Sequence, residues 1–138
     1  MNDIKNISLV EHLSCSKSPT VLGPYSIATK VNLGSVSMIF VSGTVGINPL
    51  TNEFISDDVE GQANQCLENI KQVLLENNSS LENVSKVNCF LVDMNDMKVF
   101  NEIYEKFFVS NFPARTTVAV KTLPRNAKIE IECIAFSK

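Results

Sequence analysis

The chain has 138 residues, enough for one domain and too few for two of ordinary size. Hydrophobic residues make up 44% and charged residues 20%, a globular composition that excludes bulk disorder. The net charge is -3, so nucleic acid is not expected as a partner. The chain has a single histidine, His12, which argues against catalytic mechanisms that use histidine as the general base.

The N-terminal region is predicted to be an arm of residues 1–18 with one short strand, followed by a single domain of residues 19–138. No stretch approaches the ~20 apolar residues of a membrane span, so no membrane partner is expected. The cysteines are widely spaced and three fall in apolar-periodic segments, which favours reduced, buried thiols over a zinc site. A cytoplasmic location is expected, and an organelle address in the first dozen residues is left open.

The first half of the domain is predicted to contain a β-hairpin and a helix. Residues 25–33 and 36–42 are β-rich and are separated by Gly34-Ser35, which indicates a two-residue turn. A loop follows from Gly43 to Asn52. Asp57 and Glu60 resemble a capping box at the start of the helix. The apolar stripe of this helix consists of Val59, Ala63, Cys66, Leu67, Ile70, Val73 and Leu74.

The second half begins with a predicted strand over residues 84–92 and a second helix capped by Asn95 or Asp96. The apolar and aromatic face of this helix, interpreted as core, consists of Met97, Phe100, Ile103, Tyr104, Phe107 and Phe108. Alternation over residues 115–121 and 128–135 then predicts an antiparallel hairpin. The order predicts an α+β fold with two helices on one face of a mixed sheet.

In this register, the face of the hairpin away from the helices carries Arg115, Thr117, Glu130 and Glu132. Arg115 begins a strand after Pro113, where a planar guanidinium could bind a carboxylate with two hydrogen bonds. The pattern alone favours a different role for Arg115, an ion pair with Glu132 inside the chain.

Other side chains are weaker candidates. Glu130 stands between two isoleucines and either holds a water for catalysis or faces solvent. Tyr25 follows Gly23-Pro24 and either enters a pocket or covers the sheet edge. At Ser42-Gly43 the glycine permits a close approach of backbone and ligand, although a turn alone also explains it.

Six motifs occur in one order along the chain: Gly23-Pro24-Tyr25-Ser26, Phe40-Val41-Ser42-Gly43, Gln62 through Ile70, Asn101 through Tyr104, Pro113-Ala114-Arg115-Thr116, and Leu123-Pro124 with Ile129-Glu130-Ile131-Glu132. Together they resemble the YjgF-like Rid family, the reactive-intermediate imine deaminases. The resemblance runs from about residue 18 to the C-terminus.

The resemblance implies a chorismate-mutase-like fold and a homotrimer with clefts between subunits. It also implies a hydrolase that removes damaging metabolites: 2-imino or enamine acids such as 2-aminoacrylate are converted to 2-keto acids and ammonia. The resemblance implies that this reaction needs no cofactor or metal. By this resemblance Arg115 binds the substrate carboxylate, and Glu130 and Tyr25 place the water. The residues that line or support the pocket are Gly43, Ser42, Thr117 and Asn101.

Three positions depart from the family pattern. Ile27 and Thr44 stand where glutamine is frequent, and Thr117 replaces a frequent cysteine, so the substrate range stays open. The alternative functions are a 2-keto-acid-binding regulatory protein, which would use the same arginine, and an endoribonuclease or translation inhibitor, which the acidic composition disfavours. A third alternative is a chorismate mutase, but only the expected fold points to it, and a fold does not determine function.

Overall fold

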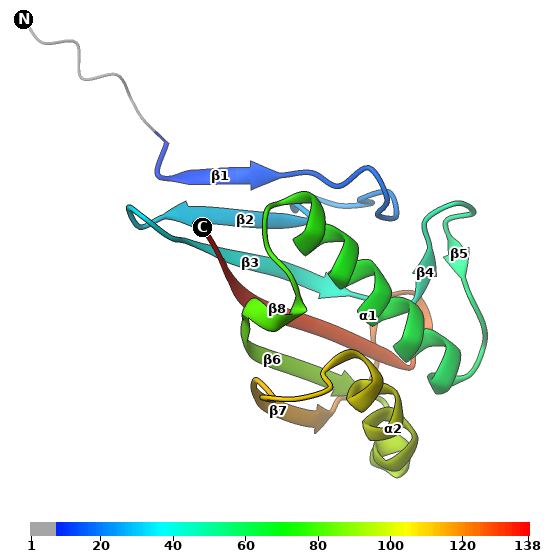
Figure 1. The fold of residues 1–138 in the computed structure, drawn as a ribbon. Helices are drawn as coiled ribbons and strands as arrows, with labels where there is room; N and C mark the ends of the chain where they lie inside the picture. The colour runs from blue at the N-terminus through cyan, green and yellow to red at the C-terminus, as the bar shows by residue number, and fades with distance from the viewer. Residues whose placement is uncertain (1–7) are drawn as a thin grey trace, which may run out of the picture.

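The structure, a computed structural model, describes residues 8–138 and is built on one six-stranded sheet (Figure 1). The first seven residues of the predicted arm lie outside this range. The strands follow the order β1-β2-β3-β8-β6-β7 across the sheet. Their bounds are β1 Val10–Leu13, β2 Ala28–Asn32, β3 Ser37–Thr44, β8 Ile129–Ser137, β6 Val84–Leu91 and β7 Ala114–Ala119. Neighbouring strands are antiparallel except β6 and β7, which are parallel, so the predicted mixed sheet is confirmed.

Both predicted helices are present, and both cover the same face of the sheet (Figure 1). Helix α1 spans Val59–Glu76, and its cap is Asp58, whose carboxylate accepts a hydrogen bond from the Gly61 N–H at 2.7 Å. The prediction of a capping box at Asp57 was therefore wrong by one residue. Helix α2 spans Met97–Phe107 and begins after Asp96, as predicted.

The core lies between the helices and the sheet. The apolar stripe predicted for α1 is buried throughout, and on β8 every second residue from Ile129 to Ala135 is buried. Three of the four cysteines are part of this core, as predicted: Cys66, Cys89 and Cys133 are free thiols that are at most 5% exposed.

The predicted hairpin of the last two strands was wrong. β8 does not pair with β7; it lies between β3 and β6, and β7 forms the sheet edge beside β6. The predicted inward side of β8 is confirmed, but that of β7 was wrong, because Val118 faces the open side and not the helices. Alternation does not say which strand is the neighbour or which side faces the helices. β8 carries apolar residues on both faces, including Ile134 and Phe136, so a central position buries more apolar surface than a place in a terminal hairpin.

The predicted hairpin placed Arg115 and Thr117 on the same face as Glu130 and Glu132, and the observed structure separates these two pairs. Arg115 pairs in register with the buried Val87, and Thr117 with the buried Cys89, so both point to the helix side. Glu130 and Glu132 alternate with the buried residues of β8 and point to the opposite, open side. The expectation that all four share one face is therefore corrected.

The open side of the sheet is partly apolar. Phe40 lies beside Ile134 in register, and Phe90 beside Val118, with Phe40 39% and Val118 42% exposed. Most residues of this face are only half-buried in the single chain. An apolar sheet face of this extent is typical of an interface between subunits.

Two further differences concern short elements. The predicted loop from Gly43 to Asn52 contains β4 (Ile47–Asn48), which pairs with β5 (Glu53–Phe54) in a small separate hairpin. The first strand of the predicted N-terminal hairpin begins at Ala28 rather than at Tyr25, which leaves Tyr25 on a loop. Within residues 8–138, neither helix has the length and hydropathy needed to cross a membrane.

Candidate functional site

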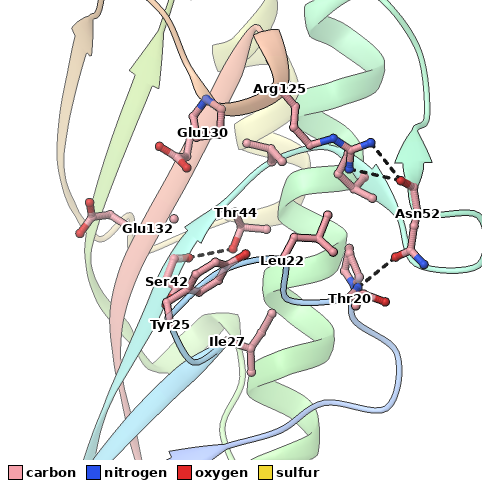
Figure 2. A pocket seen from close by; sticks show the side chains of 15 residues that line it. Thr20, Leu22, Tyr25, Ile27, Ser42, Thr44, Asn52, Arg125, Glu130 and Glu132 are labelled. Atoms are coloured by element: carbon pink, nitrogen blue, oxygen red, sulfur yellow. Dashed lines mark hydrogen bonds between the residues drawn. The ribbon is translucent and has the colours of Figure 1, made fainter.

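A cavity of about 620 Å³ lies on the open side of the sheet, where the end of β3 meets β8 and the loop before β2. We call it the open-side pocket (Figure 2). Four predicted site residues line it: Tyr25, Ser42, Gly43 and Glu130. The Tyr25 ring lies beside the end of β3, across the cavity from the Glu130 carboxylate, and is 52% exposed.

Gly43 makes room for the carboxylate of Glu130. The pairing of β3 with β8 shifts by one residue between Val41 and Thr44, which is the signature of a β-bulge. A Cβ atom on Gly43 would lie 2.8 Å from Glu130 Oε1. A side chain at this position would force the Glu130 carboxylate to move, so glycine permits the contact seen here. The close approach at Gly43 is thus made by the side chain of the neighbouring strand.

Glu130 is half-buried, and this environment disfavours its charge. Burial raises the pKa of its carboxyl above the usual 4.5, and the nearby Glu132 raises the pKa further. A carboxyl group of this kind is a suitable proton acceptor for a bound water.

The raised pKa of Glu130 predicts a pH-dependent stability. The folded chain binds the Glu130 proton more tightly than the unfolded chain, so protonation of Glu130 favours the folded state. This favourable effect on the free energy of unfolding is complete below the unfolded-state pKa and is lost as the pH rises through the folded-state pKa. Glu130→Gln removes the charge and keeps the shape. We expect the variant to be more stable than the wild type at pH 8, with a smaller difference at pH 5. Urea unfolding at both pH values tests this, and an equal difference at both would contradict it.

Sequence reasoning missed the residues that form the outer rim of this pocket. The Asn52 carbonyl accepts hydrogen bonds from both terminal nitrogens of Arg125 at 3.2 Å, and Asn52 Oδ1 accepts one from the Thr20 N–H at 3.0 Å (Figure 2). Arg125 also forms an ion pair with Glu53 at 3.6 Å. These bonds join three loops that are distant in sequence. Within each loop the sequence indicated only a turn and gave no sign of these contacts.

Arg115 lies in a second, smaller cavity of about 280 Å³ between β7 and α2, which we call the helix-side cleft. Its residues are Asn101, Tyr104, Glu105, Phe112, Pro113 and Arg115. The guanidinium carbon of Arg115 lies 4.7 Å from the centre of the Tyr104 ring and 5.6 Å from that of Phe100. Aromatic faces of this kind hold a guanidinium by cation–π attraction.

The helix-side cleft contains polar groups without partners. Within residues 8–138, Arg115 forms no ion pair within 4 Å, although Glu105 lines the same cleft. The predicted alternative, an ion pair with Glu132, is ruled out because the two side chains lie on opposite faces of the sheet. The buried side-chain oxygens of Asn101 and Tyr104, two residues that line this cleft, also have no hydrogen-bond partner.

Such an arrangement is typical of a ligand site. A half-buried cation and buried polar atoms without partners are costly, and they persist where a ligand satisfies them. A guanidinium is the preferred partner of a carboxylate, so the helix-side cleft can bind a small carboxylic acid. Among the described residues, no group of three or more His, Cys, Asp or Glu could hold a metal ion.

Within one chain the predicted site residues thus form two groups. Tyr25, Ser42, Gly43 and Glu130 gather in the open-side pocket, and Arg115 and Asn101 gather in the helix-side cleft, with Thr117 further along β7 on the same face. The sheet separates the groups, and one chain does not bring Arg115 and Glu130 together.

Fold and site together define a class of small α+β proteins with two helices on one face of a mixed sheet, a half-buried glutamate on the open face and an arginine cleft on the helix side. The family described as Endoribonuclease L-PSP matches residues 15–137. "Reactive Intermediate Deaminase A, chloroplastic" from Arabidopsis thaliana is 45% identical over 91% of this chain and 65% of its own length. The human "2-iminobutanoate/2-iminopropanoate deaminase" is 38% identical over 90% of this chain and 88% of its own length.

A solved structure agrees with these matches. The YjgF gene product from E. coli superposes with a TM-score of 0.84 at 37% identity, over 93% of this chain and 99% of that chain. The chain therefore belongs to the family described as Endoribonuclease L-PSP, the YjgF-like Rid family whose motifs the sequence resembles.

Proposed function

We propose that this protein hydrolyses reactive 2-imino acids and their enamine tautomers, such as 2-aminoacrylate, to 2-keto acids. One water is consumed: its oxygen becomes the keto oxygen, and the imine nitrogen leaves as ammonia. The observation that carries the proposal is Arg115, a guanidinium held against two aromatic rings in a cleft with polar atoms that lack partners. The names of the Arabidopsis and human relatives support the same reaction.

We assign the roles that the family resemblance implies. Arg115 binds the substrate carboxylate with two hydrogen bonds, supported by Asn101 from helix α2 and by Thr117 from β7 on the helix side of the sheet. Glu130 accepts a proton from the attacking water, and Tyr25 holds this water in place. Gly43 and Ser42 shape the floor beneath them. An imine carbon is already electrophilic, so orientation and one proton acceptor suffice, and general base help is typically worth about 10²–10⁴-fold.

This assignment requires two copies of the chain, because Arg115 and Glu130 face opposite sides of one sheet. We propose that the open-side pocket of one subunit meets the helix-side cleft of its neighbour in a homotrimer, with three sites between subunits. The apolar side chains exposed on the open side support this assembly, since an interface would cover them. The proposed location is the cytoplasm, and the chloroplastic relative leaves an organelle open.

The proposal is tested by keto acid release. An amino acid oxidase generates the 2-imino acid from alanine or leucine in the presence of the protein, and the initial rate of keto acid formation is measured. We expect a rate well above that of the spontaneous reaction and proportional to protein concentration. A rate equal to the spontaneous one, together with tight binding of pyruvate, would instead identify a keto-acid-binding regulatory protein.

A further inference from the structure

The loop that carries Tyr25 is held mainly at its two ends. Within residues 8–138, residues 21–25 form a single hydrogen bond, from the Tyr25 N–H to the Gly23 carbonyl at 2.9 Å, and this bond is local to the loop. A Cβ atom on Gly23 would lie 3.3 Å from the Tyr25 ring, so the ring packs on its own loop and moves with it. The place of Tyr25 in the open-side pocket therefore depends on what holds the ends of the loop.

The end of the loop after Tyr25 is attached to Ser42. The Ser42 hydroxyl donates a hydrogen bond to the Ser26 carbonyl at 2.5 Å, and the Ser42 N–H donates one to the Ile27 carbonyl at 3.0 Å. Ser42 belongs to β3, which is paired with a neighbouring strand on each side. This end of the loop is thus fixed by the sheet itself.

The end of the loop before Tyr25 is attached to Asn52. Asn52 Oδ1 accepts the hydrogen bond from the Thr20 N–H at 3.0 Å (Figure 2). Asn52 lies in the turn between β4 and β5, with a φ of 58° in the left-handed region. These strands have two residues each, and a hairpin of this size is at best marginally stable by itself. This end of the loop therefore needs further support.

Arg125 provides that support. Its two terminal nitrogens both donate to the Asn52 carbonyl at 3.2 Å, and its guanidinium carbon lies 5.5 Å from the centre of the Phe54 ring on the same hairpin. The ion pair with Glu53 adds little, because it is 3.6 Å long and the Glu53 side chain is 77% exposed. Arg125 precedes β8, the strand of Glu130, so it connects the start of that strand to the loop of Tyr25.

We infer that Arg125 is a positioning residue, which acts through Asn52 to fix the loop that carries Tyr25 relative to Glu130. This inference rests on the proposed function and deepens it, because Tyr25 and Glu130 are the residues that we assign to the attacking water. The terminal nitrogens of Arg125 are engaged with Asn52 and leave substrate binding to Arg115. Loss of Arg125 should therefore weaken the catalytic step more than the binding of the imine.

Arg125→Ala is expected to lower kcat about tenfold and to change KM by less than about twofold. A catalytic group displaced by 1 Å can cost about 10²-fold, and a loop held at one end still places Tyr25 correctly part of the time. Arg125→Lys should restore part of the loss, since an ammonium can donate one hydrogen bond to the same carbonyl. In a Tyr25→Phe background, Arg125→Ala should cost less than about twofold more, because both changes act on one group.

Two further variants separate the hydrogen bonds from the ion pair. Asn52→Gly keeps the backbone carbonyl and suits the left-handed conformation, but it removes the side chain that holds Thr20, so kcat should fall as in Arg125→Ala. Glu53→Gln is the matched control. It removes the exposed ion pair of Arg125 and leaves both bonds to Asn52, so kcat should stay at the wild-type value.

Limited digestion with chymotrypsin tests the loop without using the reaction. Cleavage after Tyr25 should become about tenfold faster in Arg125→Ala and in Asn52→Gly, as expected when a hydrogen bond from a charged donor no longer opposes opening of the loop. Glu53→Gln should be cleaved at the wild-type rate.

The outcomes for the loop and for the reaction are separable. If Arg125→Ala has the wild-type kcat and cleavage rate in a protein that hydrolyses imines, the inference is wrong and the proposed function stands. A full further tenfold loss in the Tyr25→Phe background would also overturn it, since Arg125 would then act independently of Tyr25. Faster cleavage of the variant in a protein that hydrolyses no imine would support the role of Arg125 in the loop and overturn the proposed function.

Discussion

Arg115→Ala is expected to lower kcat/KM for imine hydrolysis by about 10²–10³-fold, because loss of one partner of a desolvated charge pair typically costs 2–5 kcal/mol and about 1.4 kcal/mol corresponds to tenfold. The substrate carboxylate would lose the only cation that lines the helix-side cleft in the described chain. Arg115→Lys keeps the charge but loses the planar fork and its stacking on Tyr104, so we expect an intermediate loss of about tenfold or more.

The measurement is keto acid release at several imine concentrations, with circular dichroism as the check on folding. Lys71→Ala is the matched control, because Lys71 is a cation on α1 outside both cavities that we assign to the site. It removes the same charge and should leave kcat/KM unchanged. Equal rates for Arg115→Ala and the wild type would end the proposal that this guanidinium binds the substrate.

Mixing two inactive variants is expected to restore activity. Arg115→Ala lacks the carboxylate partner, and Glu130→Gln lacks the proton acceptor, so each alone should be nearly inactive. If each site takes Arg115 from one subunit and Glu130 from its neighbour, equal and random mixing gives about a quarter of the sites both intact residues. Co-expression of the two variants should therefore yield about a quarter of the wild-type activity.

A second mixture provides the control for this experiment. Tyr25→Phe and Glu130→Gln alter residues of the same open-side pocket, so every mixed site lacks one of the two groups. This mixture should show no activity beyond that of its components. If the Arg115 and Glu130 variants also fail to restore activity after verified subunit exchange, the site does not form between subunits.

The helices and strand β6 could be predicted from the sequence because their signals are local. The apolar stripe from Val59 to Leu74 repeats at helical spacing, and the alternation from Val84 to Leu91 fits one half-buried strand. The small β4–β5 hairpin was missed, since two residues per strand carry no periodicity. The cap of α1 was misplaced because Asp57 and Asp58 are equally suitable in type.

The candidate site was predictable only in part. Sequence motifs identified Tyr25, Gly43 and Glu130, and the structure gathers all three in one pocket. They also identified Arg115, but its predicted neighbour Glu132 lies across the sheet. Tyr104 was interpreted as core, since an aromatic residue at helical spacing says nothing about whether its hydroxyl finds a partner.

The residue pattern alone thus established the order of the two helices and the long strands and the inward side of β8, because side-chain periodicity is a property of one segment at a time. It assigned the two sides of β7 the wrong way round, since alternation separates two sets of side chains and does not say which set faces the helices. Only the folded chain decided which strands are neighbours. β8 lies in the interior of the sheet, where one of its apolar faces is covered by the helices and the other is available for a partner. β7 lies at the edge beside β6. That choice depends on contacts between residues far apart in sequence, and it turns Arg115 and Glu130 to opposite sides of one sheet.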